Sequence, residues 1–67
     1  MKEVLKVSNL NTNEDVSSLR DSISNNEGII ACEISLSKKE VNIVFDDTVI
    51  TLDKILASVE ELGYSTN

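Results

Sequence analysis

The sequence predicts an α+β fold of the ferredoxin-like βαββαβ type, in which a four-stranded antiparallel sheet carries two helices on one face. Three stretches alternate apolar and polar residues, as strands with one buried face do. Two further stretches repeat apolar residues at helical spacing. The elements follow in the order strand, helix, strand, strand, helix and short last strand, and both helices can bury their apolar stripes only against the same face of the sheet. At 67 residues, we expect a single domain, residues 1–67.

The first half of the chain contains a strand, a polar loop and a helix. Alternation predicts the strand over residues 3–8, and residues 9–14 form a loop in which only Leu10 is apolar. The helix that follows carries a narrow stripe at i, i+3 and i+7, formed by Val16, Leu19 and Ile23. It ends in the turn residues 25–28, where Asn or Gly can adopt the left-handed cap conformation.

The second half contains two strands, a helix and the start of a last strand. Residues 30–36 and 40–45 alternate and are joined by a short turn. The inward residues of the first of these two strands are predicted to be Ile30, Cys32, Ile34 and Leu36. Thr51 is expected to cap a helix with the clearest period in the chain, formed by Leu52, Ile55, Leu56, Val59 and Leu62. Gly63 ends it, and Tyr64–Asn67 leave room for only a short last strand.

The apolar positions of these elements are expected to form one core. Its predicted members are Leu5, Val7, Leu10, Val16, Leu19, Ile23, Cys32, Ile34, Leu36, Val41, Ile43, Phe45, Leu52, Ile55, Leu56, Val59 and Leu62. The other face of the sheet is expected to stay in water, with Lys2, Lys6, Ser8, Glu33, Ser35 and Asn42. A buried Cys usually behaves as a small hydrophobic residue, so Cys32 is predicted to fill the core.

Composition excludes several classes of function. Twelve acidic and six basic residues give a net charge of −6, which argues against binding nucleic acid or an anionic membrane surface. A single Cys excludes an internal disulfide framework and a zinc site built from Cys alone, and no His is present as a general base or metal ligand. The longest apolar run, Ile29–Cys32, is too short to span a membrane, and no apolar signal segment follows Met1, so we expect a cytoplasmic protein.

The predicted topology sorts the polar segments to two ends of the molecule. The loop 9–15, the turn 37–39 and the residues after the second helix should lie at one end. Asp46 and Asp47 should lie at the other end, with residues 25–28. This acidic pair therefore cannot act together with the acidic residues of the loop, and a solvated turn before the second helix is the expected role.

The segment Leu5–Val16 resembles the metal-binding segment of heavy-metal-associated (HMA) domains, which include small copper chaperones and the N-terminal domains of heavy-metal P-type ATPases. That segment reads roughly Val-x-Gly-Met-Thr-Cys-x-x-Cys-Val. Val7 and Val16 match it, Leu10 stands for the Met and Asn9 for the Gly, and Thr12 and Asp15 stand for the two Cys. The resemblance extends over the chain through Gly28-Ile29, Cys32–Leu36, Val41–Asp46 and Glu60–Tyr64.

The resemblance implies a site whose two metal-binding thiolates are replaced. Soft ions such as Cu(I) prefer thiolates, and neither the hydroxyl of Thr12 nor the carboxylate of Asp15 suits them, so no metal ligand and no cofactor is expected. Instead Thr12-Asn13-Glu14-Asp15 reads as a capping box that begins a helix. A hard-cation site at Glu14 and Asp15 is the alternative, although Ca²⁺ and Mg²⁺ normally require more oxygen ligands. Tyr64 lies where a Tyr lines the metal site of bacterial chaperones, and here it either keeps that place or covers Leu10.

Two functional hypotheses remain. The first is an HMA-like domain that acts by protein contact with a heavy-metal ATPase or a metallochaperone homologue. Its expected interaction surface is Asn11, Asn13, Glu14, Ser17, Arg20 and Tyr64. The second is a genuine heavy-metal-binding or transport protein that uses non-thiolate or intermolecular ligands. The sequence leaves open whether the two Cys were lost naturally or in the laboratory, and whether the chain is a monomer or a weak dimer.

An enzyme is the least favoured class. Acylphosphatases share the predicted topology, but they bind phosphate with a Gly-rich loop and an Arg. Here Arg20 lies in a helix and the first Gly is Gly28. No nucleophile and base can be paired, so no catalytic residue is predicted.

Overall fold

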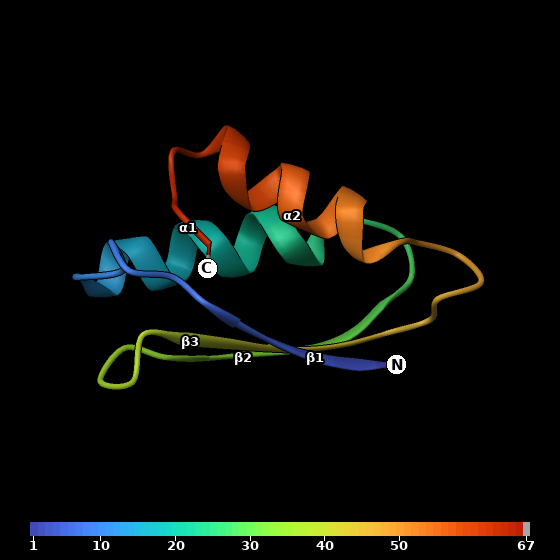
Figure 1. Cartoon of the computed structure of the whole chain (residues 1–67), viewed down its shortest axis with the longest axis horizontal. Coiled ribbons are helices and arrows are strands. Elements are labelled where there is room, and N and C mark those ends of the chain that lie inside the picture. The colour runs from blue at the N-terminus through green and yellow to red at the C-terminus, as the bar shows by residue number, and fades with distance from the viewer. Residues whose placement is uncertain (67) are drawn as a thin grey trace.

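The computed structural model describes residues 1–66 and shows a sheet with two helices packed on one face (Figure 1). The elements are β1 (Lys2–Lys6), α1 (Asn13–Ser24), β2 (Ile29–Ser35), β3 (Glu40–Phe45) and α2 (Leu52–Glu61). The strand order is β1-β3-β2, with both pairs antiparallel. This arrangement confirms the predicted ferredoxin-like α+β fold. Neither helix of the described residues has the length and apolar character needed to cross a lipid bilayer.

The predicted fourth strand is reduced to one isolated bridge. Thr66 pairs with Val7 in antiparallel fashion, and the sheet of named strands therefore has three members within residues 1–66. Of the four predicted strands, three are therefore present as strands, and the fourth is present in the described residues only as this bridge. Asn67, the end of the predicted last strand, lies outside the described residues.

The core lies between the sheet and the helices, as the alternating and helical patterns predict. Its buried members are Leu5, Val7, Leu10, Leu19, Ile23, Val41, Ile43, Phe45, Ile50, Ile55 and Val59. Other predicted core residues are partly buried and pack against this cluster, namely Val16, Cys32, Ile34, Leu36, Leu52 and Leu56. Ile50 was not predicted, because it lies in the irregular segment before α2, where no periodicity marks it.

One residue predicted to face inward, Ile30, and one predicted core residue, Leu62, are exposed. Ile30 is 68% exposed, because a bulge between Ile29 and Ala31 shifts the alternation of β2 at this point. Ile29 therefore faces the core beside Phe45, and Cys32 again faces inward opposite Ile43. Leu62 is 45% exposed, because α2 ends at Glu61 and Leu62 caps it beyond the last regular turn. The prediction that Ile30 faces inward and the prediction that Leu62 lies in the core were both wrong.

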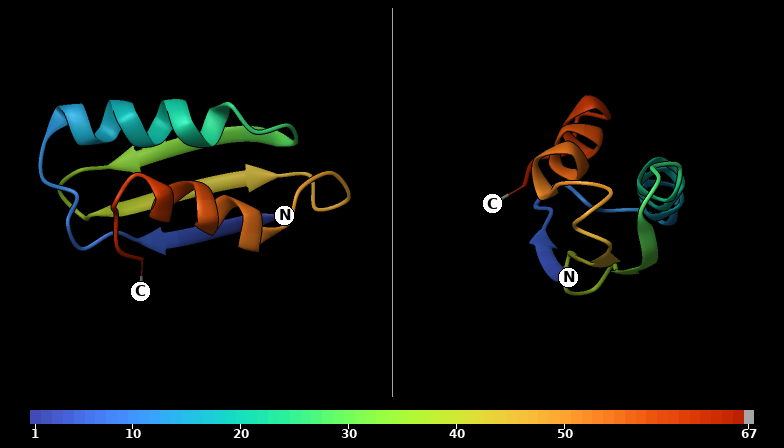
Figure 2. Two further views of the ribbon diagram at one scale, coloured as in Figure 1. Left: turned by 90° about the horizontal axis from the view of Figure 1, so that it is seen from above. Right: turned by 90° about the vertical axis from the view of Figure 1, so that its right-hand side faces the viewer.

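The two ends of the molecule are arranged as predicted (Figure 2). At one end, the amide of Val7 donates to the carbonyl of Lys39 in the β2–β3 turn, at 2.9 Å. The loop after β1 also contacts the residues that follow α2 there. At the other end, the amide of Asp46 donates to the carbonyl of Gly28, at 2.8 Å. The acidic pair at residues 46 and 47 is therefore remote from the N-terminus of α1.

Candidate functional site

The N-terminus of α1 begins with the predicted capping box. Thr12 has an extended backbone conformation, and its Oγ1 accepts from the amide of Asp15 at 3.1 Å. In return, Oδ2 of Asp15 accepts from the amide of Thr12 at 3.0 Å. It also accepts from the amide of Asn11 at 2.9 Å. These bonds satisfy amides that would otherwise lack partners at the start of a helix.

Tyr64 completes the set of hydrogen bonds at Asp15. Its phenol donates to Oδ1 of Asp15 at 2.6 Å, across 49 positions of sequence. This bond lowers the pKa of Asp15 most, and the bonds from Asn11 and Thr12 lower it further. Burial opposes them, and the resulting pKa is about 2 instead of 3.8. The same bond, together with burial and the carboxylate charge, raises the pKa of Tyr64 above 10.0. Asp15 is therefore a carboxylate at neutral pH with both oxygens engaged.

Two residues that were not predicted as site residues join the same end. The side-chain amide of Asn9 donates to the carbonyl of Gly63 at 3.0 Å, and its oxygen accepts from the amide of Ser65 at 2.9 Å. Lys39, which has a positive φ of 55°, donates from Nζ to the carbonyl of Ser8 at 3.2 Å. The only sequence signal for Asn9 was its place at the Gly position of the resemblance, and Lys39 carried none.

Most residues of the predicted interaction surface lie at this end, but they differ in accessibility. Asn11, Asn13, Glu14 and Ser17 are exposed around the start of α1. Tyr64 is half-buried, because its ring packs against the core and its phenol bonds to Asp15. Arg20 is exposed farther along α1, and its charge acts on the thiol of Cys32.

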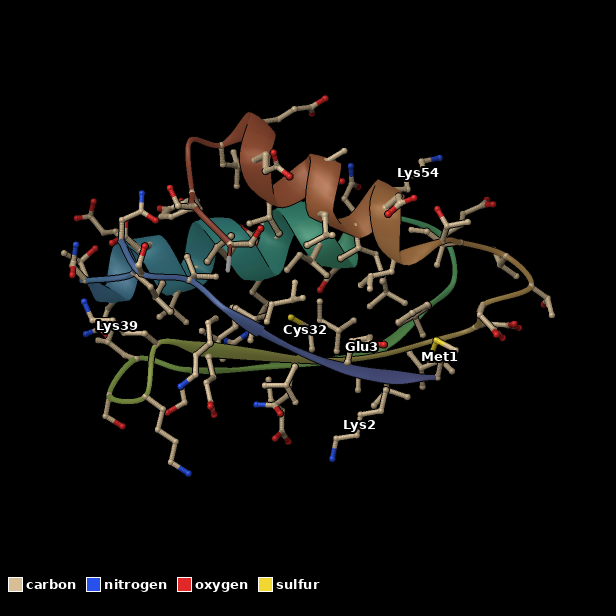
Figure 3. All side chains as sticks on the ribbon, in the orientation of Figure 1. Met1, Lys2, Glu3, Cys32, Lys39 and Lys54 are labelled. Carbon is tan, nitrogen blue, oxygen red and sulfur yellow. The ribbon has the colours of Figure 1, made fainter. Side chains whose placement is uncertain are left out.

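Cys32 lies in the middle of β2, away from the capping box. Figure 3 shows it between the sheet and the helical layer. It is partly buried and packs against the core, as predicted. Burial raises the pKa of its thiol, and the charge of Arg20 opposes this only in part. The thiol is therefore held in its protonated form, which is neither the nucleophile nor the metal ligand that a thiolate would be.

The donor set at the start of α1 does not suit a soft metal ion. The two positions at which the resemblance expects Cys offer a hydroxyl and a carboxylate, and both side chains are engaged in the capping box. Within residues 1–66, no three His, Cys, Asp or Glu side chains come together in a way that could hold a metal ion. The chemistry that this end supports is hydrogen bonding and negative charge.

Comparison with known proteins places the whole chain in one family. It is 22% identical over 63 residues to the copper chaperone CopZ of Staphylococcus aureus, which covers 94% of this chain and 93% of that protein. The structure of a CopZ metallochaperone superimposes over the full length of both chains, with a TM-score of 0.96 and 19% identity. Oxidized MerP from Ralstonia metallidurans CH34 superimposes with a TM-score of 0.94 and 18% identity, over all of this chain and 93% of that one. The sequence profile of the heavy-metal-associated domain matches residues 4–65, and the chain therefore belongs to the heavy-metal-associated domain family.

Proposed function

We propose that this chain is an HMA domain that has lost soft-metal binding and acts through contact with another protein. The observation that carries the proposal is the engagement of Thr12 and Asp15. The resemblance puts these residues at the two Cys positions, and the side chain of each forms a capping hydrogen bond at the N-terminus of α1. A bound ion would have to displace these bonds and would gain only hard oxygen ligands.

The alternative of metal binding through other ligands has less support. Asp15 is the one acidic side chain at a family ligand position, and the amides of Asn11 and Thr12 and the phenol of Tyr64 already occupy its oxygens. A shared site between two chains would need Cys32, which packs against the core of its own chain. Both routes require native contacts to break before an ion can bind.

The proposed partner is a heavy-metal ATPase or a metallochaperone homologue. Solved structures similar to this chain include a copper binding domain from HMA7, a P-type ATPase, with 18% identity and a TM-score of 0.92 over 98% of this chain and 89% of that one. The proposed contact surface is Asn11, Asn13, Glu14, Ser17, Arg20 and Tyr64. Because Glu14 and Asp15 give the start of α1 a negative charge, a partner with a basic surface is favoured over an acidic one.

The proposal assigns no catalytic role to the chain. The phenol of Tyr64 and the carboxylate of Asp15 are the closest approach to an acid–base pair at this end. Their pKa values move apart, that of the acid downward and that of the phenol upward, so neither group exchanges a proton readily near neutral pH.

Titration with Cu(I) tests the loss of metal binding. The parent chain, the double variant Thr12→Cys/Asp15→Cys and each single variant are titrated under reducing conditions, and native mass spectrometry counts the bound ions. The double variant is expected to bind one Cu(I) per chain, or per shared dimer site, in competition with a soft-ligand chelator. The helix N-terminus helps by lowering the pKa of the new thiols. The parent should not bind, and each single variant should bind much more weakly.

Two results would contradict the proposal. Stoichiometric tight binding by the parent would show that soft-metal binding is retained. A folded double variant without Cu(I) binding above the parent would show that residues 9–16 are aligned wrongly with the family's metal segment. Circular dichroism on each variant separates these results from a loss of folding.

A titration against a purified HMA domain tests the docking half of the proposal. The isotope-labelled chain is mixed with an ATPase domain from the same genome, and backbone resonances are followed. Shifts should be concentrated at the start of α1, and Glu14→Lys should weaken binding to a basic partner surface. Shifts confined to the open face of the sheet would refute the proposed surface.

A further inference from the structure

We propose that Gly63–Thr66 is a strap whose Tyr64–Asp15 hydrogen bond keeps the loop Ser8–Asn11 in one conformation without any metal ion. This strap is a conformational device of the chain itself, and it does not depend on whether a partner docks at this end. A closed strap engages polar groups of Asn9 and Asp15 in hydrogen bonds that an open strap would release.

The residues of the strap are paired with the loop, with Val7 just before it, or with the start of α1. The carbonyl of Gly63 and the amide of Ser65 bond to the two ends of the Asn9 side-chain amide, at 3.0 and 2.9 Å. The carbonyl of Ser65 accepts from the amide of Ser8 at 3.3 Å, and Thr66 forms the bridge with Val7. Between these contacts, Tyr64 bonds to Asp15 at 2.6 Å.

The loop is held from its other side by the β2–β3 turn. Nζ of Lys39 donates to the carbonyl of Ser8 at 3.2 Å and to Oδ1 of Asn11 at 2.8 Å. Figure 3 shows Lys39 at the same end of the molecule as the loop. Beneath these polar contacts, Leu10 is fully buried in the core. The loop is thus restrained by the strap, by the turn and by its own apolar anchor.

The strap is the part of this assembly that can open at least cost. It follows the end of α2 at Gly63, whose φ is +89° and around which no atom would meet an added Cβ. Gly63 and Ser65 are exposed, and the strap belongs to no helix or named strand. Segments with few buried apolar contacts open locally at low free energy, and only Tyr64 of the strap packs against the core, so the position of the other strap residues depends on hydrogen bonds. The bond from a phenol to a carboxylate is the charge-assisted one among them.

Amide hydrogen exchange on the Tyr64→Phe variant tests the strap. Phe keeps the ring and removes only the hydroxyl. Exchange at the amides of Ser8 and Ser65 is expected to become severalfold faster than in the parent, while the amide of Ile43 in β3 reports unchanged global stability. Asp46→Asn is the matched control, because it removes a hydrogen-bonded carboxylate at the opposite end. Unchanged exchange at Ser8 and Ser65 in Tyr64→Phe would overturn the proposal.

A second variant tests whether the contacts act as one unit. Asn9→Ala removes the two bonds to Gly63 and Ser65 but leaves Tyr64 and Asp15 intact. Because Tyr64 is the one aromatic phenol and no Trp is present, its ionisation can be followed by absorbance. If the strap opens as a unit, Asn9→Ala lowers the pKa of Tyr64 toward 10.0. If the pKa of Tyr64 is as high in Asn9→Ala as in the parent, the bonds of Asn9 and the bond of Tyr64 form independently of each other. That result would refute a strap that opens as one unit.

Discussion

Asp15 performs several structural tasks with one side chain. It accepts hydrogen bonds from the amides of Asn11 and Thr12 and from the phenol of Tyr64. It also puts negative charge in the first turn of α1, where the helix dipole favours it. A Cys at this position has a single sulfur atom, so it could not accept on two sides as the two carboxylate oxygens of Asp15 do. With Asp15 in place of the family's Cys, this position therefore holds hydrogen-bonded carboxylate oxygens instead of a metal-binding sulfur.

Acid should destabilise the protein in a way that depends on Asp15. The pKa of Asp15 in the folded chain is about 2, below its ordinary value of 3.8. A lowered carboxyl pKa stabilises the folded state above the unfolded pKa, and that contribution is lost as pH falls through the folded pKa. The free energy of unfolding should thus decrease between about pH 4 and pH 2, and Asp15→Asn should make this decrease shallower. Urea unfolding at a series of pH values measures it.

Asp46 provides the comparison for this acid dependence. Its pKa is also lowered, chiefly by hydrogen bonds from the side chain and amide of Thr48. Asp46→Asn should remove a separate part of the pH dependence and leave the part due to Asp15. An Asp15→Asn variant with the same acid dependence as the parent would contradict the role assigned to the bonds at Asp15.

At the scale of elements, both helices begin with a Thr cap, but only α1 has a full capping box. Thr51 accepts from the amide of Lys54 at 3.3 Å, and no acidic side chain reaches back to it in the way Asp15 reaches back to Thr12. The apolar stripe of α1 is narrow, and only Leu19 and Ile23 are buried from it. α2 also has two fully buried residues, Ile55 and Val59, but its Leu52 and Leu56 add partly buried surface, so α1 depends more on its capping.

Removal of the Thr12 hydroxyl should lower stability measurably. Loss of an N-cap Thr costs about 1 kcal/mol, and in a chain of this size that corresponds to a fall of roughly 4–8 °C in melting temperature. Thr51→Ala, which removes the cap of α2, is the matched control and should fall in the same range. Thermal melts followed by circular dichroism give both values. A Thr12→Ala melt that matches the parent, beside a lowered Thr51→Ala melt, would show that the cap of α1 contributes nothing.

At the scale of the whole molecule, the acidic residues are dispersed rather than gathered. The net charge is −6, yet Glu14 and Asp15 lie at one end and Asp46 and Asp47 at the other. Such a distribution attracts divalent cations through the general field of the protein and not through one coordinated site.

Divalent cations should leave the melting temperature unchanged once ionic strength is matched. Millimolar Ca²⁺ or Mg²⁺ is compared with NaCl of the same ionic strength, which controls for screening of the net charge. A specific site would stabilise the folded state in proportion to its occupancy. A melting temperature raised by Ca²⁺ or Mg²⁺ beyond the NaCl control, and no longer raised in Asp15→Asn, would support the hard-cation alternative instead.

The strap also bears on the Cu(I) experiment. Asp15→Cys removes the acceptor of Tyr64 in the same step that it adds a thiol, so the double variant loses the charge-assisted bond of the strap. The loop of that variant should be freer to bring two sulfur atoms to one ion. Combining the double variant with Tyr64→Phe should therefore change its Cu(I) affinity little.

Local patterns in the sequence were enough to predict the order of the elements, the capping box and most of the core. Each of these depends on residues a few positions apart, such as Thr12 with Asp15 or Ile55 with Val59, whose relation is set by the geometry of a single helix or strand. That a capping box replaces the two Cys could be predicted for the same reason, since this prediction needed only the identities of residues 12 and 15. The order of the elements also predicted the topology that joins them, because both helices can bury their apolar stripes only against the same face of the sheet.

Only the tertiary structure decided the features that depend on distant residues. The bulge that exposes Ile30, the burial of Ile50 and the single bridge at Thr66 follow from how the sheet and its loops pack together. The bonds of Tyr64 to Asp15 and of Asn9 to Ser65 span 49 and 56 positions of sequence, and no local spacing signals them. Sequence by itself determines the elements because their geometry is local, whereas the contacts between them exist only once packing has brought separate segments to the same end of the molecule.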